Sequence, residues 1–123
     1  MALSVTDHDS AVDYKIVHES SLNATPDNNV TSGPGTLHSG FINNNNNQYI
    51  YIKIVDAYSA SAGSTNPTWV FPCAANSVLS FEIPGGQTFS ALSIWCTTGA
   101  SPADSTAPSL GVGESVKVYL VTS

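Results

Sequence analysis

Apolar residues recur at every second position through much of this chain, and Gly, Pro, Ser and Asn separate the alternating stretches. A period of two puts successive side chains on opposite faces of a β-strand, whereas a helix repeats every three to four residues. The alternating segments are 12–17, 36–42, 49–56, 68–71, 78–83, 91–97 and 115–122. Seven short strands separated by turn residues predict an all-β chain, an antiparallel β-sandwich or jelly-roll-like single domain.

The segment 49–56 contains the best candidate for the core. Ile50, Ile52 and Ile54 share one face of the expected strand, and the residues between them face the other way. Branched aliphatic side chains favour strands and pack well in a sheet interior. We therefore expect this strand to run through the centre of the domain.

Turn residues predict where the strands end. Pro72 is expected to stop the strand 68–71, and the sequence Pro-Gly-Gly at 84–86 to close the strand 78–83. The five asparagines at 43–47 are expected to form a loop between two strands, because Asn tolerates left-handed turns. Their amides also have the chemistry to bind sugar hydroxyls.

The first 20 residues are treated separately from the sandwich, which we assign to 21–123. Residues 1–20 form either an arm that reaches a neighbouring molecule or an edge strand of the sheet. Val12, Tyr14 and Ile16 alternate with polar residues, which favours the edge strand slightly.

Composition excludes several classes of partner. The chain has 123 residues with three Lys, no Arg and a net charge of −6, and Ser, Thr and Asn supply most of its polar groups. Nucleic-acid binding needs a basic patch, so it is excluded. No apolar run approaches the roughly 18 residues that span a bilayer, and the first residues lack the pattern of a secretory signal. We expect a protein made in the cytoplasm that has neither nucleic-acid nor membrane partners.

The two cysteines leave two alternatives open. Cys73 and Cys96 lie at or within apolar strand segments, where a free thiol behaves as a small hydrophobic group. A Cys73–Cys96 disulfide requires the two strands to be neighbours. A reducing site of synthesis favours the free thiols.

The titratable residues show no catalytic pattern. The densest cluster, Asp7-His8-Asp9, lies near the chain start, and His18 and His38 stand apart in the sequence. An active site needs a nucleophile with a base, paired carboxylates or a metal cluster held rigidly. The sequence predicts no enzyme activity, no cofactor and no metal.

Several short segments between residues 30 and 123 occur together in an order typical of one family. They are 30–37, 49–56, 81–86, 92–94, 97–100 and 104–108. In these segments the chain resembles the small all-β proteins that decorate or cement the capsids of tailed bacteriophages. The resemblance implies a homotrimer on the outside of the virion, bound to the major capsid protein, without enzymatic activity.

Strand-face aromatic and apolar residues are the predicted protein contacts. Tyr49, Tyr51 and Tyr119 lie opposite the aliphatic positions of their strands, and the N-terminal segment adds a second set. The predicted contact residues are Val12, Tyr14, Ile16, Tyr49, Tyr51 and Tyr119. The alternative is a carbohydrate- or receptor-binding sandwich of a phage fibre or spike, in which the aromatic rings and the asparagines bind sugar.

Overall fold

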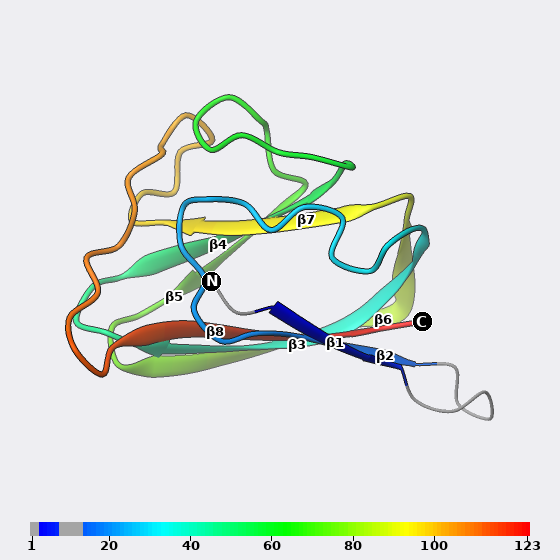
Figure 1. Cartoon of the computed structure of the whole chain (residues 1–123), viewed down its shortest axis with the longest axis horizontal. Helices are drawn as coiled ribbons and strands as arrows, with labels where there is room; N and C mark the ends of the chain where they lie inside the picture. The colour runs from blue at the N-terminus through cyan, green and yellow to red at the C-terminus, as the bar shows by residue number, and fades with distance from the viewer. Residues whose placement is uncertain (1–2, 8–13) are drawn as a thin grey trace.

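The computed structural model describes residues 3–7 and 14–123, which form eight strands and no helix (Figure 1). The first four strands are β1 (Leu3–Asp7), β2 (Lys15–Glu19), β3 (Gly35–Asn45) and β4 (Ile50–Asp56). The other four are β5 (Trp69–Cys73), β6 (Ser77–Phe89), β7 (Leu92–Thr97) and β8 (Ser115–Thr122).

The strands form two antiparallel sheets that face each other. The five-stranded sheet has the order β1-β2-β8-β3-β6 and the three-stranded sheet has the order β5-β4-β7. In Figure 1 the three-stranded sheet lies above the five-stranded one. The prediction of an all-β antiparallel sandwich is confirmed.

The pairing is nested, as in a jelly roll. β2 pairs with β8, β3 with β6 and β4 with β5, so each pair is enclosed by the one before it along the chain. The segment 23–30 takes the place of the missing partner of β7, through hydrogen bonds such as Asp27 N–H to Ile94 O at 2.8 Å and its reciprocal at 2.9 Å. Nested pairing of this kind is the double Greek key of jelly rolls.

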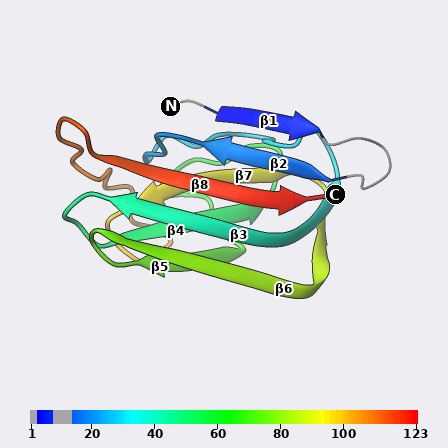
Figure 2. The ribbon, with the colours of Figure 1, turned by 90° about the horizontal axis from the view of Figure 1, so that it is seen from below.

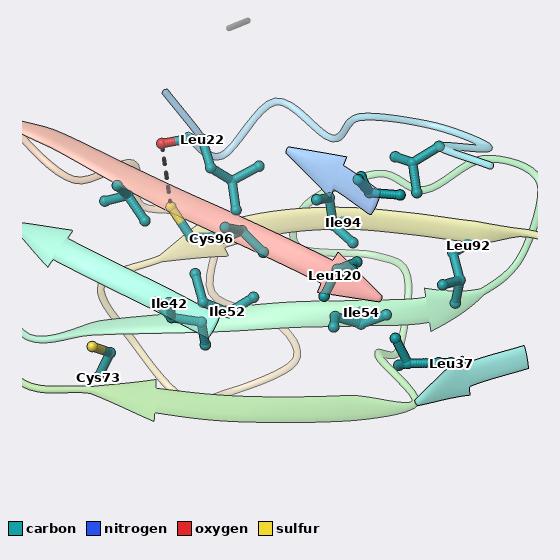
Figure 3. Close-up of a cluster of buried hydrophobic side chains, with 14 of the residues drawn as sticks. Leu22, Leu37, Ile42, Ile52, Ile54, Cys73, Leu92, Ile94, Cys96 and Leu120 are labelled. Atoms are coloured by element: carbon teal, nitrogen blue, oxygen red, sulfur yellow. Dashed lines mark hydrogen bonds between the residues drawn. The ribbon is translucent and has the colours of Figure 1, made fainter. Parts of the chain in front are cut away.

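The core lies between the two sheets. Ile50, Ile52 and Ile54 are fully buried, as predicted. Every second residue of β8 is also buried and faces this core. Figure 3 shows the aliphatic side chains of both sheets meeting in this layer. Burial of each such side chain stabilises the fold by about 1.5–3 kcal/mol.

Two strands continue through residues that were expected to end them. β6 runs to Phe89, past the expected turn at 84–86, because Gly85 (φ 80°) and Gly86 (φ 75°) adopt the left-handed conformation of a bulge. The register of β6 against β3 shifts there. Pro72 lies within β5 instead of stopping it, since β5 is an edge strand in which a missing N–H is tolerated.

The asparagine run forms the corner between the two sheets. Residues 43–45 belong to β3, which contradicts the expectation of a loop beginning at residue 43. None of residues 43–47 has a positive φ, so left-handed turns do not explain the run. Asn44 is instead fully buried, and its amide donates to the carbonyls of Gln48, Cys73 and Ala74.

The N-terminal segment joins the five-stranded sheet. β2 begins at Lys15, and its buried residues are Val17 and Glu19, while Ile16 faces away from the core. Within residues 1–20, β1 forms the edge of the sheet and covers the free side of β2, so β2 is an internal strand. Val12 lies outside the described residues.

Candidate functional site

A row of aromatic side chains crosses the outer face of the five-stranded sheet, the face turned away from the core. Figure 2 looks onto this sheet, with β2, β8 and β3 side by side at its centre. His18 and Phe41 both pair with Tyr119 in register, one on each side. The His18 ring stacks on that of Tyr119, with ring centres 4.2 Å apart and an interplanar angle of 7°. The centre of the Phe41 ring is 6.1 Å from that of Tyr119, and the two planes are tilted by 58°. We call these three residues the aromatic row.

A second row runs beside the aromatic row. Ile16 and Val121 pair in register and add aliphatic surface, and Ser39 and Glu82 continue the row across β3 and β6. The remaining outward residues of the face are largely polar: Ser4, Thr6, Asn43, Asn45, Ser80, Ser115 and Lys117, with Val78 at the β6 edge. An apolar centre with a polar rim is the composition of a protein–protein contact surface.

The outer face contains a hollow of about 230 Å³ where β8, β3 and β6 meet. It is lined by Ser39, Gly40, Phe41, Ser80, Phe81, Glu82, Tyr119 and Val121. Ser39 and Ser80 are short and stand between taller neighbours, which leaves the depression open. The exposed Glu82 carboxylate supplies its only acidic group.

The predicted contact residues occupy separate surfaces. Ile16 and Tyr119 lie on the outer face of the five-stranded sheet. Tyr49 and Tyr51 lie in contact, with ring centres 5.3 Å apart, and Tyr51 is on the outer side of the three-stranded sheet. Tyr14 precedes β2, and its ring lies perpendicular to that of His38, with the ring centres 5.6 Å apart. The structure therefore places Tyr119 on one sheet and Tyr51, with the neighbouring Tyr49, at the other.

Three important residues of the outer face were missed in the sequence. In the sequence, His18 stands apart from the other titratable residues, and no motif marks Phe41 or Glu82. Alternation shows only which side of its own strand a residue occupies. The neighbours of Tyr119 follow from the pairing of β8 with β2 and β3, strands distant in the sequence.

Loops cover the outer side of the three-stranded sheet. Lys53 and Trp95 point to that side, yet both are fully buried. The Lys53 ammonium group donates to the carbonyls of Ser101 at 2.7 Å and Asp104 at 3.3 Å. Burial lowers the pKa of Lys53, and the nearby Asp104 carboxylate opposes that shift. Lys53 thus holds the segment 98–108 onto the sheet.

Two acidic side chains meet inside the sandwich. Glu19 is fully buried and Asp27 is 7% exposed, and their carboxyl groups are hydrogen bonded. Burial, together with the bond to Glu19 and its charge, raises the pKa of Asp27 to about 7. A contact between two carboxyl groups requires a shared proton. The pair ties the segment 23–30 to β2.

Replacing Asp27 by Asn is expected to change how stability depends on pH. The folded protein keeps a proton on Asp27 that the unfolded chain releases near pH 4, so wild-type stability falls as pH rises from about 4 to 7. Relative to wild type, the free energy of unfolding of D27N should rise by about 3–4 kcal/mol across that interval. Urea denaturation at several pH values measures this difference. A constant difference between the two proteins would contradict the shared proton.

Both cysteines are free and buried, and they lie on different strands. Cys73 is on β5 and Cys96 on β7, with β4 between them (Figure 3). Two strand spacings are roughly 10 Å, beyond the roughly 7 Å limit between the Cα atoms of a disulfide. Burial raises the pKa of both thiols, that of Cys96 to about 12, which keeps them unreactive.

In the described part of the chain, no three His, Cys, Asp or Glu residues lie together as a metal site. The cluster at residues 7–9 extends into residues outside that part. Residues 3–7 and 14–123 include no helix long and apolar enough to cross a membrane. Comparisons of the chain with family models, curated proteins and solved structures find no match.

Proposed function

We propose that this protein decorates the capsid of a tailed bacteriophage and binds the major capsid protein through the outer face of its five-stranded sheet. The observation that carries the proposal is the apolar centre of that face, formed by the aromatic row with Ile16 and Val121. The jelly-roll arrangement is used by viral shell proteins and by lectins, so the fold alone does not select between them.

The outer face suits repeated attachment to a protein shell. A sheet is rigid, so its side chains are ordered before binding and lose little entropy in the complex. Charged residues are few in the chain, which suits a contact whose area is supplied mainly by packing. A homotrimer, as the family resemblance implies, would present three such faces, and linked weak contacts multiply affinity.

The aromatic row favours a protein partner over a sugar. A sugar ring packs on a free aromatic face, and Tyr119 has a neighbouring ring on each side. The carbohydrate-binding alternative is supported elsewhere, by the contacting pair Tyr49 and Tyr51, of which Tyr49 is 49% exposed. Binding on a glycan array that disappears in Y49A and Y51A would favour that alternative.

The proposal predicts that binding to shells depends on the aromatic row. The test is sedimentation of the purified protein with shells of the major capsid protein from the same phage genome. Y119A and F41A are expected to weaken binding at least tenfold. Truncation of a central aromatic residue to alanine typically costs about 2 kcal/mol or more of binding free energy. Y58A is the control, because Tyr58 is 73% exposed and lies outside the strands.

Circular dichroism and thermal denaturation establish that each variant is folded. Failure of the wild-type protein to sediment with shells would refute the proposal. Equal binding by Y119A, F41A and Y58A would refute the assigned face.

A further inference from the structure

We propose that the hollow on the outer face binds an arginine side chain of the partner protein. The location of the partner rests on the proposed function. The chemistry of the occupant follows from the size of the hollow, its walls and the charge of the whole chain.

The hollow has the size of a site for one side chain. Its volume is about 230 Å³, and it is open to solvent. Pockets that enclose whole small-molecule ligands usually measure roughly 300–1,000 Å³. A long side chain projecting from a partner surface fits a hollow of this size and shape better than a free ligand does.

The walls combine aromatic rings with one carboxylate. Phe41 and Tyr119 stand next to each other on one side of the hollow, and Val121 adds aliphatic surface. Glu82 lies across Ser39, in the same row as Val121. An apolar stem would contact the rings and Val121 while its cationic end reaches Glu82.

Arginine matches these walls better than lysine does. A guanidinium group is planar and binds a carboxylate through two parallel hydrogen bonds, while its aliphatic stem packs against apolar walls. An ammonium group is more strongly hydrated and offers no planar fork. An uncharged side chain of similar length would leave Glu82 without a cationic partner.

The arginine must come from a different protein. This chain contains no arginine, so a second copy cannot supply one. Its net charge of −6 favours a partner with a basic surface. Lys117 is the one lysine on the outer face. It precedes Tyr119 by two residues on β8, whereas Val121, which shares a row with Glu82, follows Tyr119 by two residues. Lys117 therefore leaves the Glu82 end of the hollow open to a foreign cation.

Titration with N-acetyl-arginine amide, followed by NMR of the labelled protein, tests the hollow directly. We expect saturable shifts of the amides of residues 39–41, 80–82 and 119–121, with a Kd of the order of 10 mM for this single anchor. N-acetyl-lysine amide should bind several-fold more weakly. The uncharged isostere N-acetyl-citrulline amide should give no saturable shifts there.

Two variants separate the charge from the shape of the hollow. E82Q should weaken binding of the arginine probe at least tenfold, and S39L should abolish it by filling the hollow. E114Q is the matched control, because it removes the same charge from a loop and keeps the oxygen that accepts from Gly111 N–H. The NMR spectra of the free variants establish that each is folded.

The outcomes distinguish this inference from the proposed function. Equal shifts with the citrulline probe, unchanged binding in E82Q, or no saturable shift with the arginine probe would overturn the arginine site. Loss of shell binding in Y119A but not in E82Q would support the capsid contact and refute the arginine anchor. Arginine-probe binding to a protein that does not sediment with shells would support the anchor and refute the capsid role.

Discussion

Replacing Asn44 by Asp is expected to lower the free energy of unfolding by about 3–5 kcal/mol. The Asn44 side chain is fully buried, and its amide nitrogen donates to Gln48 O at 2.8 Å, Ala74 O at 3.0 Å and Cys73 O at 3.3 Å. Aspartate has nearly the same shape. Its ionised form would direct a negative oxygen at these carbonyls, and its neutral form would supply a single donor.

The matched control is the adjacent residue. Asn45 is exposed and donates one hydrogen bond, to Gly113 O at 3.1 Å, so N45D should cost less than about 1 kcal/mol. Urea denaturation of the three proteins measures both effects. Similar decreases in the free energy of unfolding of N44D and N45D would contradict the structural role assigned to the buried Asn44 amide.

The second large effect is expected at Lys53. K53A should lower the free energy of unfolding by about 3–4 kcal/mol, because it leaves a cavity and removes the donor to two carbonyls. The segment 98–108 should then become sensitive to protease in the otherwise folded protein, since Lys53 is one of its main attachments to the sheet.

Methionine at the same position separates packing from hydrogen bonding. K53M keeps most of the volume and should recover about half of the loss, as apolar replacement of a buried charge often does. K117A, on the partly exposed lysine of the outer face, should change stability by less than about 0.5 kcal/mol. If K53A were as stable and as resistant to protease as the wild type, Lys53 would not be what holds the segment 98–108 onto the sheet.

The buried lysine also bears on which surface is available to partners. The segment 98–108 covers the outer side of the three-stranded sheet, and Gly63 of the preceding long loop packs against Ser105. The five-stranded sheet has no such cover among the described residues, and its aromatic row remains partly exposed. The chain thus covers one of its two sheets itself and presents the other.

Strand positions could be read from the sequence because alternation is a local property. β8 has the predicted bounds, and the inward faces of β4 and β8 are those predicted. Local signals failed where another contact outweighed them. Positive φ at Gly85 and Gly86 let β6 continue through a predicted turn, and hydrogen bonding inside the corner fixed the asparagine run.

The sequence by itself determined an all-β sandwich, the faces of its main strands and the absence of arginine, since period and composition need no knowledge of distant neighbours. Only the tertiary structure decided that His18, Phe41 and Tyr119 form one row, that Tyr51 lies on the other sheet, and that Lys53 is buried. Those relations depend on pairing between strands as far apart as β2 and β8. Such pairing is selected by burial of the whole core and not by any one segment.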